Sequence, residues 1–210
     1  MAMTLKKLLL VDNYDSFVFN LKHLFESLPN VHMTVVRNDV DFLSDLRQQK
    51  YDGLIIGPGP GSPDDINYFG GCMQAIKEFG SKGFPIFGVC LGFQGIAIAY
   101  GCTLKRATLP MHGKISSLHL VEPSALLDDG YEGTEVMRYH SLMIDMKRPF
   151  SAELKITAEV ADGEHSCVAN GREVMGIEHI TLPLFGVQFH PESFGTPKGK
   201  ELAESFVNRC

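Results

Sequence analysis

The first hundred residues alternate between short apolar runs and longer stretches in which apolar residues recur at helical spacing. Continuous apolar runs without polar alternation are typical of parallel strands that are covered on both faces. The expected strands in this half are 7–11, 33–37, 53–56 and 84–89, and the expected helices are 17–28, 41–49, 65–79 and 91–100. We expect Asp15 or Ser16 to cap the first helix. Strands that alternate with helices favour a parallel sheet with helices on both sides.

After residue 101 the pattern changes and strand-like stretches dominate. The expected strands are 103–105, 114–121, 135–139, 154–160, 166–168, 174–179 and 184–189, and an amphipathic helix over 197–208 closes the chain. The dipeptide Asn170-Gly171, between two of these strands, predicts a hairpin. We therefore expect an α/β fold, with a mostly parallel open sheet, helices on both faces, and mixed or antiparallel strands added in the C-terminal half.

Composition narrows the class of protein. With 44% hydrophobic and 21% charged residues, the 210 residues are expected to form one domain with a packed core, spanning 1–210. The net charge of −6 argues against a nucleic-acid-binding surface. The five cysteines are odd in number and lack zinc-site spacing, which favours a reduced, cytoplasmic protein. The apolar run after Lys7 stops at Asp12, too short for a signal peptide or a membrane span.

One cysteine stands where an expected strand meets an expected helix, in Gly88-Val89-Cys90-Leu91-Gly92. A cysteine between a strand and a helix, flanked by glycines, has the arrangement of a nucleophile elbow with sulfur in place of oxygen. Gly88 and Gly92 suit the sharp turn, and the helix N-terminus favours the reactive thiolate. A lone cysteine is more often a small buried hydrophobe, so a nucleophilic Cys90 needs a second group in its support.

The second group comes from Gly186-Val187-Gln188-Phe189-His190-Pro191-Glu192-Ser193. A nucleophilic cysteine requires a base, and the base requires a partner that fixes its tautomer. His190 stands at the end of an expected strand, and Glu192 lies two residues on in extended chain, so the two side chains are expected on one side. Spacing alone leaves His112 and His140 as competing bases. The plain alternative is a surface-turn histidine beside a solvated glutamate.

A glycine- and proline-rich turn, Gly57-Pro58-Gly59-Pro60-Gly61, follows the expected strand 53–56. It is not a phosphate loop, because no Gly-Lys-Ser/Thr follows and the prolines lack the N–H groups that such a loop uses. The turn is stiff, and a backbone N–H in it could form an oxyanion hole with the N–H of Leu91. Because active sites of parallel sheets lie beyond the carboxyl ends of the strands, Asp12, this turn and Cys90 are expected along one edge.

The stretch Gly88-Val89-Cys90-Leu91-Gly92-Phe93-Gln94, together with Phe189-His190-Pro191-Glu192-Ser193, resembles the class I, or triad-type, glutamine amidotransferases. Within them the chain is similar to the small glutaminase subunits of anthranilate synthase and aminodeoxychorismate synthase. The other matching stretches run nearly end to end: Asp12-Asn13-Tyr14-Asp15-Ser16-Phe17, Gly57-Pro58-Gly59-Pro60-Gly61, Met111-His112-Gly113-Lys114, Arg138-Tyr139-His140-Ser141-Leu142 and Thr196-Pro197-Lys198-Gly199. Phe93 departs from the pattern, in which many relatives carry histidine, and we expect altered packing there.

The resemblance implies a role for each site residue. Cys90 would attack the side-chain amide of glutamine, His190 would act as general base and then acid, and Glu192 would orient His190. The residues implied in holding the substrate and its oxyanion are Gly59, Pro60, Gly61, Leu91, Gln94, Ser141 and Leu142. The subunit would need no metal or cofactor. Its ammonia would pass to a chorismate-binding synthase subunit in a hetero-oligomer, with Met111-His112-Gly113-Lys114 contacting that partner.

Two other functions remain open from the sequence. The same scaffold serves γ-glutamyl hydrolases and the glutaminases of other synthetases, although the stretches around His112 and His140 weigh against both. A non-catalytic binding protein would be expected to lack part of the triad, and Cys90, His190 and Glu192 are all present. The sequence leaves the choice between the anthranilate and aminodeoxychorismate pathways open.

Overall fold

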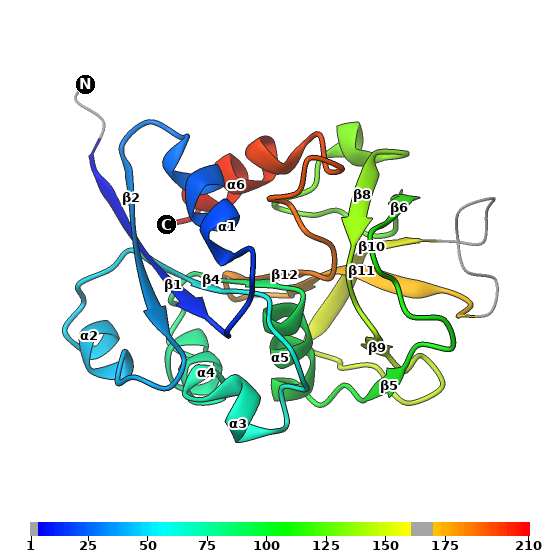
Figure 1. The fold of residues 1–210 in the computed structure, drawn as a ribbon, viewed down its shortest axis with the longest axis horizontal. Coiled ribbons are helices and arrows are strands. Elements are labelled where there is room, and N and C mark those ends of the chain that lie inside the picture. Colours follow the sequence, from blue (N-terminus) through cyan, green and yellow to red (C-terminus); the bar gives the residue numbers. More distant parts are fainter. Residues whose placement is uncertain (1–3, 161–169) are drawn as a thin grey trace.

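A sheet of eight strands organises the computed structural model, which describes residues 4–160 and 170–210 (Figure 1). Its order is β2 (Val31–Arg37), β1 (Lys6–Asp12), β3 (Gly53–Ile56), β4 (Ile86–Val89), β12 (Leu184–Val187), β11 (Glu173–His179), β10 (Leu154–Val160) and β7 (His119–Leu120). The pairings from β2 to β12 are parallel, and those from β12 to β7 are antiparallel. The expected fold class, with a mostly parallel sheet extended by antiparallel strands, is confirmed.

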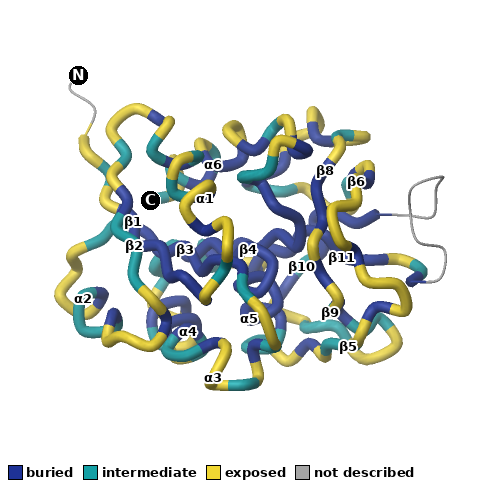
Figure 2. The backbone as a smooth tube through the Cα atoms, viewed as in Figure 1, coloured by how far each residue is buried: buried dark blue, intermediate teal, exposed yellow. Residues whose placement is uncertain are grey.

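Helices cover both faces of the parallel part of the sheet (Figure 1). On one face lie α1 (Val18–Glu26) and α6 (Gly199–Val207), and on the other lie α2 (Leu43–Arg47), α3 (Ile66–Phe69), α4 (Cys72–Ala75) and α5 (Leu91–Ala99). Alternation within β1 explains the two cores, since Leu8 and Leu10 pack with α1 and α6, whereas Leu9 and Val11 pack with the other helices. Figure 2 shows the central strands buried throughout.

Two small sheets lie apart from the eight-stranded sheet. The strands β5 (Leu104–Arg106) and β9 (Leu142–Ile144) form one antiparallel pair, and β6 (Lys114–Ser117) and β8 (Glu135–Arg138) form another. A 3-10 turn, η2 (Asp129–Tyr131), precedes β8. The predictions had missed β9 and η2, and the stretch expected as one strand over 114–121 is divided into β6 and β7.

Three other predictions differ in outcome. The prediction of a single helix over 65–79 is wrong. Helix α3 ends at Gly70, which has φ +51° and ψ −131°, and the chain continues as α4 and a π-helical turn, η1 (Ile76–Gly80). The capping prediction is also wrong. The N-cap of α1 is Phe17, with no side-chain cap, and Asp15 instead accepts a hydrogen bond from the Phe17 N–H at 2.7 Å. The strand expected over 166–168 lies outside the described residues, so the predicted hairpin stays a prediction.

The pairing of β4 with β12 places two distant parts of the chain side by side at the centre of the sheet. Gly88 is in register with Gly186, and Val89 is in register with Val187. The two strands run in the same direction, so the segments that follow them, 90–99 and 188–192, leave the sheet at the same edge. Within the described residues, no helix is long and apolar enough to cross a membrane.

Candidate active site

Cys90 is the N-cap of α5 and has a backbone conformation that side chains rarely adopt, with φ +53° and ψ −97°. Two flanking glycines make this sharp turn possible. A Cβ on Gly88 would lie 2.4 Å from the Gly92 carbonyl carbon, and a Cβ on Gly92 would lie 2.1 Å from the Ile56 oxygen. The Cys90 N–H donates to the Val187 carbonyl at 2.9 Å, which ties the elbow to β12.

His190 lies just beyond β12 and is fixed through its backbone and its ring. Its N–H donates to the Met137 carbonyl at 2.9 Å, and the Thr196 hydroxyl donates to its carbonyl at 2.7 Å. The Tyr139 ring meets the imidazole edge to face, with centroids 5.2 Å apart. The imidazole is buried, and two other segments of the chain, 137–139 and the loop at Thr196, set the position of His190.

Glu192 binds the imidazole from the side expected from the sequence. Nδ1 of His190 lies 2.6 Å from Oε1 of Glu192, and the two side chains are 7% and 3% exposed. Burial by itself lowers the pKa of His190. The Cys90 sulfur and the Glu192 carboxylate outweigh that effect, and together they hold the pKa of His190 well above its usual value. Nε2 is buried without a hydrogen-bond partner among the described residues, so it is the ring atom left for proton transfer.

Two glutamine side chains connect the Cys90 sulfur to the Leu142 backbone. The Gln188 amide nitrogen is 3.5 Å from Cys90 Sγ, and its amide oxygen accepts from Gln94 at 3.0 Å. The same Gln94 nitrogen also donates to the Leu142 carbonyl at 3.3 Å. These contacts bring Gln94 and Leu142, both expected at the site, into one network with Cys90. Ser141 precedes Leu142 as an exposed residue, and its carbonyl accepts from the Ala107 N–H at 2.8 Å.

The turn after β3 lies against the start of α5 and is held from below by Asn13. The Asn13 amide donates to the Gly57 carbonyl at 2.8 Å, and Asn38 donates to the Asn13 amide oxygen at 2.9 Å. A Cβ on Gly59 would lie 2.5 Å from the Asn13 backbone oxygen and 3.1 Å from Leu91 Cδ2. The predicted neighbours Gly59 and Leu91 are thus close together.

The next two residues of that turn are Pro60 and Gly61. Pro60 is exposed, and Gly61, with φ +81°, lies against the Tyr68 ring, where a Cβ would come within 2.2 Å. At the start of α5, the first intrahelical bond runs from the Gln94 N–H to the Cys90 carbonyl, so the preceding Leu91 N–H is free of that ladder. The geometry therefore supplies a backbone donor directly beside Cys90.

The competing histidines are placed elsewhere. His112 is exposed. His140 is buried, and its two ring nitrogens contact Arg138 Nε at 3.2 Å and the Leu142 carbonyl at 3.0 Å. Burial first, and then the Arg138 charge, lower the pKa of His140 to about 3. His140 is therefore a neutral structural histidine at neutral pH, which leaves His190 as the candidate base for Cys90.

Sequence reasoning missed three residues that shape this site: Gln188, Tyr139 and Asn13. Gln188 could have been found, because it is a polar residue in an apolar strand and shares the two-residue spacing of His190. The contacts of Tyr139 and Asn13 depend on tertiary packing and leave no such signal. The unusual Phe93 is fully buried and packs against Gly186. The expected change of packing relative to a histidine stays a prediction.

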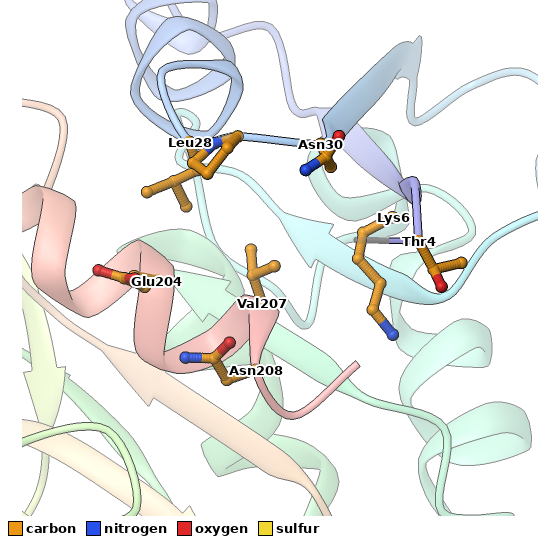
Figure 3. Close-up of a pocket in the computed structure, with 8 residues that line it drawn as sticks. Thr4, Lys6, Leu28, Asn30, Glu204, Val207 and Asn208 are labelled. Carbon is orange, nitrogen blue, oxygen red and sulfur yellow. The ribbon is translucent and has the colours of Figure 1, made fainter. Parts of the chain in front are cut away.

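Two hollows of the surface differ in their relation to this site. A pocket of about 270 Å³ opens beside the imidazole and is lined by Phe17, Asn20, Tyr139, His190, Glu192, Ser193 and Phe194. The pocket in Figure 3 is lined by Thr4, Lys6, Leu28, Pro29, Asn30, Glu204, Val207 and Asn208. Lys6 begins β1, so this second pocket lies at the amino-terminal ends of the parallel strands, at the edge opposite Cys90.

Comparisons with known proteins agree with this geometry. Anthranilate synthase component 2 of Leptospira biflexa is 41% identical, over 96% of this chain and 99% of the relative. Aminodeoxychorismate synthase of Streptomyces griseus is 39% identical over 94% of this chain, which spans only 25% of that protein. A solved structure from Thermoplasma acidophilum, described as one of the subunits of a GMP synthase, has the same fold with a TM-score of 0.80 at 21% identity, over 99% of this chain and 95% of the other. The family model for class-I glutamine amidotransferases matches residues 9–210, and the chain belongs to that family.

Proposed function

We propose that residues 1–210 form one amidotransferase domain, the glutaminase subunit of a chorismate-aminating synthase that works in the cytoplasm. The observation that carries the chemistry is the 2.6 Å contact between His190 and Glu192, with the free Nε2 of His190 beside the elbow cysteine. Family membership and the relatives named above support the substrate and the partner. Ammonia from glutamine is then the product that the partner consumes.

In the proposed reaction, each step is assigned to a residue of the site. The Cys90 sulfur forms a bond to the side-chain carbonyl carbon of glutamine, while the backbone N–H of Leu91 and a donor from the Gly59–Gly61 turn stabilise the oxyanion. The imidazolium of His190 gives its proton to the amide nitrogen, the C–N bond breaks, and ammonia leaves. Water, deprotonated by His190, then adds to the thioester and releases glutamate and the cysteine. Gln94, Ser141 and Leu142 hold the substrate.

A partner is supported by the surface next to the imidazole. Phe17, Tyr139 and Phe194, here called the aromatic rim, line the pocket at His190 and are 58%, 41% and 92% exposed. Large exposed aromatic side chains grouped in one place are typical of protein interfaces. The Streptomyces griseus relative points the same way, because the region like this chain is a minor part of a longer protein. We propose that the synthase subunit docks on the aromatic rim, close to where ammonia leaves.

The test compares glutamine and ammonium as nitrogen donors. Wild type and Cys90→Ser are each mixed with chorismate and a chorismate-binding synthase subunit, with either glutamine or ammonium as the nitrogen donor. Glutamate release and the aminated product are then measured. The expected result is that Cys90→Ser loses glutamine-dependent amination but leaves ammonium-dependent amination intact. Anthranilate as product assigns the protein to one pathway, and aminodeoxychorismate assigns it to the other.

Two results would contradict the proposal in different ways. Glutamine-dependent product formation by Cys90→Ser would show that another residue is the nucleophile. Glutamate release that is insensitive to every synthase subunit, with cleavage of γ-glutamyl peptides, would replace the synthase role by that of a stand-alone hydrolase while leaving the triad in place.

A further inference from the structure

A series of buried hydrogen bonds connects the Arg138–Glu173 ion pair to the Cys90 sulfur. The direction of these bonds is fixed by two groups: Arg138 can only donate, and the Leu142 carbonyl can only accept. Nε of Arg138 lies 3.2 Å from Nε2 of His140. That nitrogen must therefore accept, so the hydrogen of the neutral imidazole is on Nδ1. Nδ1 lies 3.0 Å from the Leu142 carbonyl and donates to it.

The Leu142 carbonyl can only accept, which fixes the next two side chains. Gln94 must turn its NH₂ group toward Leu142, at 3.3 Å. The same NH₂ group faces Gln188 at 3.0 Å, so the Gln188 atom there must be the amide oxygen. The Gln188 NH₂ group is then the end that points at Cys90 Sγ, at 3.5 Å. Both amide hydrogens of Gln94 are in use, which leaves only its oxygen for a ligand.

We propose that Gln188 is a further catalytic residue, which donates an amide hydrogen to the Cys90 sulfur and stabilises its thiolate form, and that Gln94 and His140 are positioning residues that hold Gln188 in this orientation. The proposal deepens the proposed function and rests on Cys90 as its nucleophile. A donor aimed at a sulfur favours the anion over the thiol, because only the anion is a strong acceptor.

Burial makes this donor effective. Gln188 is fully buried, and Gln94 and His140 are each 3% exposed. Away from water, a hydrogen bond to a charged atom is stronger. Because no water replaces the contacts with Gln94 and Cys90, the buried Gln188 amide keeps one orientation. At the far end, Arg138 forms a buried ion pair with Glu173, at 2.5 Å, and donates to Ser116 at 2.9 Å. The orientation of Gln188 is therefore anchored in the core of the protein.

The test measures the pH dependence of Cys90 alkylation by iodoacetamide in the purified chain, with the modified Cys90 peptide quantified by mass spectrometry. We compare wild type with Gln188→Met, which lacks the donor, and with Gln188→Glu, which keeps the size but replaces NH₂ by an oxygen. The midpoint of alkylation is expected to move up by about one pH unit in Gln188→Met and further in Gln188→Glu, while the rate at high pH does not fall, because a less stabilised thiolate is at least as nucleophilic. Thr157→Val, a buried polar position on β10 outside the network, is the control and should leave the midpoint in place.

The outcomes separate this inference from the function on which it rests. An unmoved midpoint in folded Gln188→Met, with Cys90-dependent glutaminase activity intact in wild type, overturns the role of Gln188 alone. If Gln188→Met does not fold, the isosteric Gln188→Glu decides by the same measurement. Glutaminase activity that survives Cys90→Ser overturns the proposed function and leaves the hydrogen-bond geometry as a structural feature.

Discussion

His190 Nδ1 and Glu192 Oε1 are 2.6 Å apart across a single proline, and neither side chain is accessible enough for water to compete for that contact. A buried carboxylate at Nδ1 keeps a hydrogen on that nitrogen. Nε2 then carries the lone pair or the proton that takes part in the reaction. It also stabilises the imidazolium, which is why the pKa of His190 lies above its usual value despite burial. The pair is therefore suited to hold the proton that, in the proposed mechanism, is given to departing ammonia.

Glu192→Gln should move the alkaline limb of the pH–rate profile to lower pH. The variant loses the negative charge, so the pKa of His190 falls and the imidazolium that protonates ammonia is lost at a lower pH. We expect kcat/KM for glutamine to fall by about 100-fold, against about 1,000-fold or more for His190→Ala, because an orienting group contributes less than the base itself. Steady-state glutamate release, followed across neutral and alkaline pH, measures both. An unchanged alkaline limb in Glu192→Gln would disprove the role of this carboxylate.

Cys90→Gly should be more stable than Cys90→Ala, which reverses the usual order of the two residues. Glycine is ordinarily less favourable than alanine by about 1 kcal/mol, because it loses more freedom on folding. At φ +53° and ψ −97°, however, any Cβ is strained, and that strain costs about 1–3 kcal/mol. Urea unfolding of the two inactive variants, with equal m-values, gives the comparison. A more stable alanine variant would mean that the elbow stores no strain.

The acid sensitivity of folding should decrease in His140→Gln. In the folded protein His140 has a pKa of about 3, against 6.5 when unfolded, so between these values the unfolded chain binds the extra proton. Stability from this group is therefore lost as the pH falls below about 6.5. Between about pH 7 and about pH 5, the decrease in the free energy of unfolding should be about 2 kcal/mol smaller in the variant than in wild type, as measured by denaturant titration. The raised pKa of His190 acts in both proteins and cancels. Equal losses would show that His140 is protonated in the folded state.

Glu173→Gln should destabilise the protein strongly, by about 3–5 kcal/mol, because the fully buried Arg138 would lose its countercharge. Glu78→Gln is the matched control, since it breaks a pair with Arg47 of similar length, 2.7 Å, at the surface. Water solvates both partners there, and the effect should be small by comparison. Thermal or urea unfolding at neutral pH compares the two. Similar decreases in the free energy of unfolding for both variants would mean that the buried ion pair contributes no more to stability than the surface ion pair.

Phe194→Asp should raise the concentration of synthase subunit needed for half-maximal stimulation of glutamine hydrolysis. Phe194 is 92% exposed on the aromatic rim, and a charge there would have to be desolvated in a complex. Phe19→Asp, at another exposed phenylalanine, on α1, that does not line the pocket, is the control. Titration of the partner against fixed amounts of each variant gives the result. An equal response of wild type and Phe194→Asp would place the interface elsewhere.

Sequence patterns predicted the parallel strands and the pairing of His190 with Glu192, because these depend on local periodicity and on residues close in the chain. The contact of His190 with Glu192 follows from a two-residue spacing in extended backbone. The break at Gly70 was missed, since a Cβ there would lie 2.2 Å from the Asn38 oxygen, and only the folded chain reveals that close approach. The route from Arg138 to Gln188 was equally invisible, because it joins separate elements that lie far apart in the chain. The roles given to the substrate-binding residues stay predictions.

The parallel pairing of β4 with β12 also determines when the cysteine can become active during synthesis. The strand that leads to Cys90 is translated early, but its neighbour in the sheet is made much later. Until then the nascent chain carries a thiol with no base beside it and an unpaired strand edge that other chains could bind. Because His190 and Glu192 follow β12, a chain that has not yet reached this strand lacks both the base expected for Cys90 and its carboxylate partner. A chain that ends before β12 is therefore expected to leave glutamine intact.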